Sequence, residues 1–538
     1  MRTDVSGRID LSGGITPATT RVMNLSQFLT QAARRLGDDT GLVWGDTTWT
    51  WAQVEARSAA IAAALVADFG VQKGDRILVQ SANCNQMFEA MFACWRVGAI
   101  WVPANYRQSP DEVAWLAGSS QARGLICGAA FADHARACAD QVDFTISIGA
   151  ADFGSDYDAL TDRHMGSAPS PVDVQRDDPC WFFFTSGTTG KPKAAVLTHG
   201  QMAFVATNHM CDLMPDSGPD DASIVVAPLS HGAGVHQLAQ VAKGVKTILP
   251  PGERFDPATI WALVEKWRVT NAFTVPTIVK MLVEHPAVDL HDHSSLRYVI
   301  YAGAPMYRAD QITALQKLGP VLAQYFGLGE VTGNITVLPP AQHFTDERMR
   351  IGTCGFARTG MQVQIQDAAG AEVALGGTGE ICVIGPAVFA GYFNNPDANA
   401  KAFRNGWFLT GDLGHMDADG YVYLTGRASD MYISGGSNIY PREIEEKLLL
   451  HPQVSECAIL GVPDPLWGEV GLAVVVPVPG ADAAQIDVVG WLSGQVAKYK
   501  LPKVVVFWEA LPKSGYGKIT KKLIHEELVR RGELPGQG

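Results

Sequence analysis

Short β-rich runs alternate with helical patterns through most of the chain, as in RILVQSAN at 76–83, SIVVAPL at 223–229 and RYVIYAG at 297–303. Strands that are apolar throughout and separated by helices favour parallel sheets covered by helices. In such sheets, ligands bind beyond the carboxyl ends of the strands. The alternation therefore predicts an α/β fold whose functional site lies along one edge of the sheets.

The texture of the sequence changes near Gly376, where Gly, Tyr, Val and Asp become dense and indicate a small antiparallel β unit. Beyond it, helical patterns at 441–450 and 488–499 alternate with strand patterns, as expected of a separate α/β domain of about a hundred residues. A chain of 538 residues should form more than one domain. We expect a large N-terminal domain over 1–426 and a small C-terminal α/β domain over 427–538.

Composition excludes several classes of partner. The formal net charge is −13, from 42 basic and 55 acidic residues, so the general field of the protein does not attract nucleic acid or anionic membranes. Nine scattered cysteines show no metal-binding spacing and suggest reduced thiols. No signal peptide and no membrane-spanning run is recognisable. We expect a cytoplasmic protein without integral membrane contact, either a monomer or a homodimer, that holds anionic ligands by local donors.

The string TSGTTGKPK at 185–193 lies between two strand-like runs. Gly187 and Gly190 permit backbone conformations that turn N–H groups towards an anion, and Lys191 and Lys193 add positive charge. Hydroxyl donors come from Thr185, Ser186, Thr188 and Thr189. Only two residues separate the two glycines, so this is not a Walker A loop, which needs four before its Gly-Lys pair. The string predicts a phosphate-binding loop of another kind.

Further strings follow in order: PLSHGAG at 228–234, AGAP at 302–305, FGLGE at 326–330, TGD at 410–412, GRASDMYISGGSNIYPREIE at 426–445 and PKSGYGKI at 512–519. With these strings the chain resembles the adenylate-forming superfamily, which comprises acyl-CoA synthetases, peptide-synthetase adenylation domains and firefly-type luciferases. The resemblance implies an AMP-forming acid–CoA ligase that uses ATP, Mg²⁺ and coenzyme A. A carboxylate attacks the α-phosphate of ATP, and a thiol then attacks the acyl-adenylate and expels AMP.

The resemblance also implies a nucleotide site built from three regions. Asp412 accepts hydrogen bonds from the ribose, Arg427 reaches the same nucleotide, and adenine stacks on Phe326. The implied ATP and AMP site comprises Thr185, Ser186, Gly187, Thr188, Thr189, Gly190, Lys191, Lys193, Gly303, Ala304, Pro305, Tyr325, Phe326, Gly327, Asp412 and Arg427.

Three residues are implied in catalysis: Lys518, Glu330 and His231. Lys518 lies in a Gly-rich loop and would bridge the carboxylate and the α-phosphate as negative charge builds between them. Glu330 would bind Mg²⁺ together with Thr188, because such an ion prefers oxygen ligands. His231 would lie at the entrance of the acyl pocket.

The acyl pocket is expected along His231, Gly232, Ala233, Gly234 and Val235. Its small residues suggest a medium-chain, branched or aromatic acid, and no basic residue in HGAGVHQ is present to bind a second carboxylate. The resemblance further implies that the C-terminal domain rotates about a hinge at Ser429. After the rotation, Ser434, Gly435 and Gly436 would line the coenzyme A channel.

Two positions depart from the family pattern. Gly329 replaces a threonine that donates to the α-phosphate, so one donor is missing unless Thr332 or a water supplies it, and Ser437 replaces a frequent Glu. Alternatives to the ligase are an adenylating enzyme that loads a carrier-protein phosphopantetheine, a luciferase-like oxygenase and a non-catalytic nucleotide-binding protein. The segment 228–240 has no Asp or Glu to pair with a substrate ammonium, and no carrier domain follows Lys522, which favours the ligase.

Overall fold

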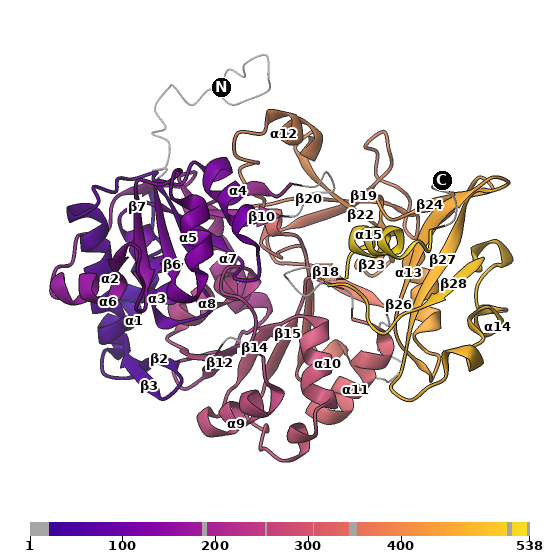
Figure 1. Cartoon of the computed structure of the whole chain (residues 1–538), viewed down its shortest axis with the longest axis horizontal. Coiled ribbons are helices and arrows are strands. Elements are labelled where there is room, and N and C mark those ends of the chain that lie inside the picture. The colour runs from indigo at the N-terminus through magenta and orange to yellow at the C-terminus, as the bar shows by residue number, and fades with distance from the viewer. Residues whose placement is uncertain are drawn as a thin grey trace.

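The computed structural model describes residues 21–185, 191–252, 255–304, 306–343, 352–513 and 519–534. Its strands form three main sheets of seven, fourteen and five strands. Figure 1 shows the first sheet on the left in indigo and purple, and the C-terminal sheet on the right in orange and yellow. Strands β1 (Arg21–Val22) and β9 (Val174–Gln175) add a small antiparallel pair.

The seven-stranded sheet has the strand order β11-β10-β5-β4-β6-β7-β8 and is parallel except for the pair β10 and β11. Its strands are β4 (Arg76–Gln80), β5 (Ile100–Ala104), β6 (Gly124–Gly128), β7 (Phe144–Ile148), β8 (Ser155–Asp156), β10 (Pro179–Thr185) and β11 (Lys193–Thr198). The antiparallel pair β10 and β11 leads into and out of the predicted phosphate loop.

The fourteen-stranded sheet has a parallel half and an antiparallel half. The parallel strands are β2 (Thr40–Trp44), β12 (Ala222–Val225), β13 (Lys246–Leu249), β14 (Asn271–Thr274), β15 (Tyr298–Tyr301) and β16 (Leu322–Phe326). The antiparallel strands are β3 (Thr47–Thr50), β17 (Thr336–Leu338), β18 (Thr353–Ala357), β19 (Gln362–Gln366), β20 (Gly379–Ile384), β21 (Phe403–Arg404), β22 (Trp407–Met416) and β23 (Tyr421–Arg427). The predicted antiparallel unit is therefore hydrogen-bonded to the parallel strands, and it begins at β17, before Gly376.

Helices form a layer between the two large sheets and cover their outer faces. The middle layer is α1 (Gln27–Leu36), α2 (Trp51–Ala67), α3 (Asn85–Arg96), α6 (Tyr157–Arg163), α7 (His199–Asp212) and α8 (Gly232–Lys243). The outer helices are α4 (Pro110–Ser120) and α5 (Ala132–Cys138) on the first sheet, and α9 (Pro257–Trp267), α10 (Pro276–Glu284) and α11 (Arg308–Leu318) on the second. Alternate strand residues face opposite cores, as Ile77 and Leu78 do, which explains the continuously apolar runs.

A row of three buried tryptophans crosses the middle core. Trp95 on α3 lies 6.5 Å from Trp101 on β5, and Trp101 lies 4.5 Å from Trp181 on β10. All three are fully buried, and the indole of Trp95 donates to the carbonyl of Cys180 at 2.9 Å. Because buried edge-to-face ring pairs are favourable, this row fixes β10 and its loop against the helical layer.

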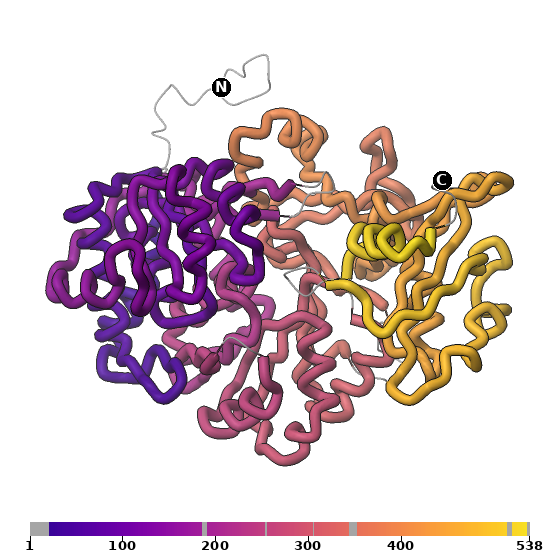
Figure 2. Tube along the Cα trace, viewed as in Figure 1, coloured from indigo at the N-terminus to yellow at the C-terminus, as the bar shows by residue number. Residues whose placement is uncertain are grey.

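The C-terminal part folds around its own sheet and its own core. The strands are β24 (Tyr432–Ser434), β25 (Ser437–Ile439), β26 (Val454–Asp464), β27 (Gly468–Pro477) and β28 (Val504–Phe507), with helices α13 (Pro441–Leu448), α14 (Val488–Leu492) and α15 (Lys521–Arg531). The expected helix over 488–499 is wrong beyond Leu492, because Ser493 takes an extended ψ of 126° and Gly494 then takes a positive φ of 84°. In Figure 2 this part lies beside the α10 and α11 region, and the ammonium of Lys280 on α10 reaches the carbonyl of Ser455 at 3.4 Å.

The predicted α/β class is thus confirmed, with helix-covered sheets in a large N-terminal part and a small C-terminal part. In the described ranges no helix is long and apolar enough to cross a membrane. The exact boundary at 426 and the mobility of the C-terminal part stay predictions.

Candidate active site

The two strands that flank the phosphate string lie side by side. Thr185 at the end of β10 pairs with Lys193 at the start of β11. The Lys191 ammonium lies 3.9 Å from the centre of the Trp115 ring, and the Lys193 ammonium lies 4.9 Å from that of Tyr392. Both lysines that are expected to bind phosphate therefore lie at the end of the string, each against the face of an aromatic ring. Ser186, Gly187, Thr188, Thr189 and Gly190 lie outside the described residues.

Glu330 is the best-positioned carboxylate of the site. It is only 5% exposed and lies in a single helical turn (Gly329–Val331) after β16. Its Oε1 accepts a hydrogen bond from Thr185 Oγ1 at 2.8 Å and another from the Tyr392 hydroxyl at 2.9 Å. Burial and the neighbouring Glu330 carboxylate raise the pKa of Tyr392, which keeps its hydroxyl protonated as a donor. Neither bond uses Oε2.

Tyr392 is a site residue that the sequence analysis missed. Its segment, which follows β20, lies along the edge of β11: Val196 N donates to Gly391 O at 2.9 Å, and Phe393 N donates to Ala194 O at 2.9 Å. This pairing links the second sheet to the first and places Tyr392 between Lys193 and Glu330. The string AGYFNN carried no pattern that could reveal a contact with residues so far away in the chain.

Gly329 has a steric explanation. A Cβ on Gly329 would lie 2.6 Å from the Phe183 ring and 2.8 Å from Thr185 Cγ2, so the space of the usual threonine is filled by Phe183. Thr332 does not replace the missing donor, because its hydroxyl donates to Val331 O at 2.6 Å. The Phe183 ring therefore occupies the space in which the usual threonine would carry its hydroxyl.

The two residues that are expected to bind the ribose lie side by side on neighbouring strands. Asp412 on β22 and Arg427 on β23 are direct register partners, and Arg427 Nε donates to Asp412 Oδ1 at 3.0 Å. Asp412 is 7% exposed, whereas the Arg427 side chain is half exposed. A buried acceptor beside an exposed guanidinium suits a nucleotide that enters from solvent.

The expected adenine residues follow the ends of adjacent parallel strands. Gly303 and Ala304 follow β15 after one intervening residue, Ala302, and Phe326 ends β16, which pairs with β15. Gly327 lies so close to Gly333 that a Cβ would stand 2.5 Å from its backbone. Pro305 lies outside the described residues.

Tyr325 turns its side chain towards the acyl segment. Its ring stacks on Phe273 at 5.8 Å, and its hydroxyl would lie 3.5 Å from a Cβ on Gly232. Alternate residues of a strand point to opposite faces, so Phe326 faces away from it. Only the backbone of Tyr325 remains for the nucleotide role expected of it.

Aromatic rings enclose the predicted acyl segment. The His231 ring lies 4.4 Å from that of Phe183, and a Cβ on Gly232 would lie 2.6 Å from the Phe273 ring. A Cβ on Gly234 would lie 2.9 Å from Trp181. Ala233 and Val235 are buried in the helical layer instead. Glycine is thus required at 232 by the Phe273 ring, and at 234 first by the carbonyl oxygen of Leu229, from which a Cβ would lie 2.2 Å.

Behind Tyr325 lies a buried polar pair that sequence reasoning did not find. The Arg358 guanidinium donates to His209 Nδ1 at 3.5 Å, and its Nε lies 3.6 Å from an oxygen of Asp212. Burial lowers the pKa of Arg358 to about 10, and burial and the Arg358 charge hold the pKa of His209 well below its usual value. His209 is therefore neutral, and its Nδ1 accepts a hydrogen bond from the guanidinium. No local pattern marks either residue.

The expected coenzyme A residues form a tight turn between β24 and β25. Gly435 and Gly436 both have positive φ, and Gly435 N donates to Trp467 O at 2.8 Å. Ser434 is buried, whereas Trp467 is 44% exposed beside the turn. Ser429 is exposed and donates to Asp430 at 3.1 Å. Lys518 lies outside the described residues.

Residues 29–393 match the model of the AMP-binding enzyme family, and residues 443–518 match that of the AMP-binding enzyme C-terminal domain. The chain belongs to this family. The expected adenylate-forming resemblance is thereby confirmed.

Relatives and solved structures agree with this assignment. The chain is 37% identical to a feruloyl-CoA synthase of Amycolatopsis sp. over 93% of its length and 98% of the relative's. It is 34% identical to an indoleacetate–CoA ligase of Aromatoleum aromaticum over 95% and 99% of the two chains. The structure of ATP-bound MatB from Rhodopseudomonas palustris superposes with a TM-score of 0.83 at 30% identity, covering 94% of this chain and 99% of that one.

Proposed function

We propose that the protein is an AMP-forming ligase that joins a monocarboxylic acid to coenzyme A, and that the acid is aromatic. The proposal rests on three aromatic side chains that surround the acyl segment: Phe183, Phe273 and Tyr325. This segment lies next to the hydrogen-bonded pair Glu330 and Thr185. Aromatic rings pack well against planar aromatic groups. The names of the feruloyl and indoleacetate relatives point to the same substrate class.

In the first step an oxygen of the acid attacks the α-phosphate of ATP, and the bond to pyrophosphate breaks. Lys191 and Lys193, which lie on the rings of Trp115 and Tyr392, would balance the charge on the leaving pyrophosphate. Asp412 and Arg427 hold the ribose in place. Lys518, carried over from the family motif, neutralises the charge that develops between carboxylate and phosphate.

Glu330 fits the role of a magnesium ligand. Two donors orient its Oε1, and Oε2 is left out of both bonds, so one carboxylate oxygen can face an ion bound to the phosphates. Glu330 would hold the ion together with a hydroxyl of the string, Thr185 or Thr188. The ion supplies charge neutralisation of the phosphates.

In the second step the thiol of coenzyme A attacks the acyl carbon, and the carbon–oxygen bond to AMP breaks. The thiol arm would reach the site past Ser434, Gly435 and Gly436 after the C-terminal part rotates about Ser429. Glycines with positive φ let the backbone approach the arm closely.

The test is pyrophosphate release measured with a panel of aromatic and straight-chain acids, with and without coenzyme A. We expect release with aromatic acids and formation of the thioester only when coenzyme A is present. Lys518→Ala should abolish release, whereas Lys522→Ala, a change in a neighbouring exposed lysine, should not. Release only with long straight-chain acids would contradict the aromatic assignment.

A carrier-protein acceptor is the second candidate, because the chain is also 32% identical to a fatty acid–[acyl-carrier-protein] ligase of Streptomyces coeruleorubidus. The same assay distinguishes the two. Thioester formed on a phosphopantetheine-bearing carrier but not on free coenzyme A would favour the second candidate.

A further inference from the structure

A second pocket, of about 440 Å³, opens at the far edge of the parallel half of the second sheet. Lys246 is the first residue of β13, and Arg297 comes immediately before β15. The expected adenine residues Gly303 and Ala304 follow the other end of β15. Four residues of strand, about 13 Å, separate the two edges. The pocket is therefore distinct from the candidate active site.

The lining of this pocket is strongly basic. Lys246, Lys266, Arg268 and Arg297 line it together with Asp220, while Asp221 pairs with Arg297 and Asp292 lies within electrostatic range of Arg268. Lys246, Lys266 and Arg268 form no ion pair with any residue in the described ranges. The positive side chains of the pocket repel one another because they lie close together. Their clustering contrasts with the chain as a whole, which carries a formal charge of −13. An anionic ligand would remove that repulsion.

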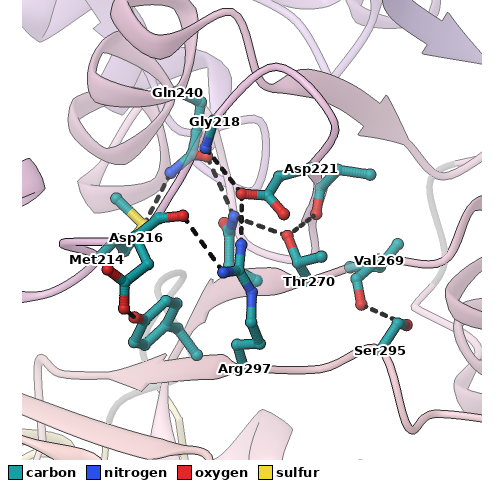
Figure 3. A network of polar contacts seen from close by, with 12 residues as sticks. Met214, Asp216, Gly218, Asp221, Gln240, Val269, Thr270, Ser295 and Arg297 are labelled. Carbon is teal, nitrogen blue, oxygen red and sulfur yellow. Dashed lines mark hydrogen bonds and ion pairs between the residues drawn. The ribbon is translucent and has the colours of Figure 1, made fainter.

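One wall of the pocket is held by a network of polar contacts, which Figure 3 shows. Arg297 pairs with the carboxylate of Asp221 and donates from Nη1 to the carbonyl of Asp216 at 3.2 Å. Asp221 is held in turn by Gly218 N at 2.8 Å. Ser295 Oγ donates to the carbonyl of Val269 at 2.8 Å and ties the loop before β15 to the loop before β14.

The other wall is formed by longer, more exposed side chains. Lys266 and Arg268 are exposed at the end of α9, and Arg268 occupies the helix cap with a left-handed φ of 47°. Trp267 lies between them, with the Lys266 ammonium 5.5 Å from the centre of its ring. These cations can close over a ligand that rests on the Arg297 wall, and the indole offers an apolar surface beside it.

We propose that this pocket binds a small molecule that carries two or more phosphate groups. Guanidinium and ammonium groups on three separate elements can neutralise several phosphate charges at once. The volume lies in the range of roughly 300–1,000 Å³ that is usual for small-molecule sites. A single carboxylate would leave most of the positive charge unbalanced.

The test uses the full chain with its active site occupied by a non-hydrolysable acyl-adenylate analogue. Inorganic tripolyphosphate and ADP are titrated separately by calorimetry, at low and at physiological salt. We expect saturable binding with a stoichiometry of one that weakens with salt. The double variant Lys266→Ala, Arg268→Ala should raise the dissociation constant at least about ten-fold, because two charged contacts are lost.

Lys401→Ala on α12 (Pro396–Ala402) is the matched control, since it removes an exposed lysine remote from the pocket and should leave binding unchanged. Unfolding temperature and pyrophosphate release should be unaltered in both variants, which shows that they fold. Tighter binding of ADP than of tripolyphosphate would identify a nucleotide, and equal binding would identify the phosphates alone. Absence of binding at millimolar concentration, or equal weakening by Lys401→Ala, would overturn the proposal.

Discussion

At the scale of single residues, Tyr325 would limit the space available to an acid bound beside Gly232, as proposed above. Its ring lies against Phe273 and beside Gly232, where a smaller residue would leave room. The hydroxyl is the atom nearest the acyl segment. The size of this one side chain therefore bears directly on which acids fit.

Tyr325→Ala should broaden the range of acids towards larger aromatic groups. We expect the ratio of kcat/KM for a bulky aryl acid to that for benzoate to rise about ten-fold or more, as differences of one or two carbon groups in an apolar pocket do. The loss of the ring should also destabilise the fold by roughly 3–5 kcal/mol. Tyr325→Phe keeps the ring and should leave the ratio nearly unchanged. An unaltered ratio in Tyr325→Ala would show that the acid lies elsewhere.

Buried neutral histidines should make the protein sensitive to acid. Burial lowers the pKa of His343 to about 4, from an ordinary value near 6.5. Because its folded-state pKa is depressed, the unfolded chain binds more protons between these values, and stability falls as pH decreases from about 6.5 to 4. For His343 alone the loss between pH 7.5 and 5 is about 2 kcal/mol.

His343→Gln should therefore reduce the difference between urea midpoints measured at pH 7.5 and pH 5. The neutral amide cannot titrate, yet it can still bond to Tyr301 and the carbonyl of Pro339, which His343 contacts at 3.1 and 2.9 Å. His525→Gln, in an exposed residue of α15, should leave the difference as it is. If His343→Gln showed the same difference between its urea midpoints at pH 7.5 and pH 5 as the parental protein, protonation of His343 would not cause the loss of stability.

At the scale of elements, the segment 390–393 joins the two large sheets at the phosphate string. It pairs with β11 on one side and carries Tyr392 to Glu330 on the other. The orientation of the proposed magnesium carboxylate therefore depends on contact between elements that are far apart in the sequence.

Tyr392→Phe should lower the rate of adenylate formation about ten-fold, because a hydrogen bond to a charged group is worth roughly 1.5–3 kcal/mol. The ring that faces Lys193 would remain. Acid-dependent exchange of pyrophosphate into ATP measures this step alone. Phe393→Leu, a change in the next residue, is the control for packing. If Tyr392→Phe exchanged pyrophosphate at the parental rate, the hydrogen bond that orients Glu330 would not contribute to adenylate formation.

The sequence predicted the parts of this site that depend on local pattern. Runs such as 76–83 and 297–303 are apolar because both faces of their strands are buried, so periodicity and length identified them. The positions of Glu330, Asp412 and Arg427 came from motif strings, and their expected roles stay predictions. Tyr392, Arg358 and His209 could not be found, because their contacts arise only when distant elements meet. The expected helix over 488–499 is too long, because the surrounding residues follow a helical pattern and only Gly494 marks the break.

At the scale of the whole molecule, the C-terminal part has its own sheet and core and is joined to the rest through the exposed residues near Ser429. It also touches α10 through Lys280. Tyr307 of the N-terminal part also lies near Arg442, Glu445 and Cys457, so a rotation between the two half-reactions would have to release these contacts as well as turn the segment near Ser429.

Ser429→Pro should separate the two half-reactions. Proline fixes φ near −65°, so a change of backbone angle at this position would be blocked. We expect thioester formation to fall at least about ten-fold, with pyrophosphate exchange less affected. Ser429→Ala keeps the backbone free and serves as the control. If both steps respond equally, or neither does, the pivot is not at Ser429.

The row of Trp95, Trp101 and Trp181 has an optical consequence. Ultraviolet excitation absorbed by any of these indoles can pass to its neighbour at such short separations, and the last of them borders Gly234, where the acid is expected. Light emitted by the protein should therefore dim or shift in colour when an aromatic acid enters, so the native chain carries its own reporter of occupancy without any added dye.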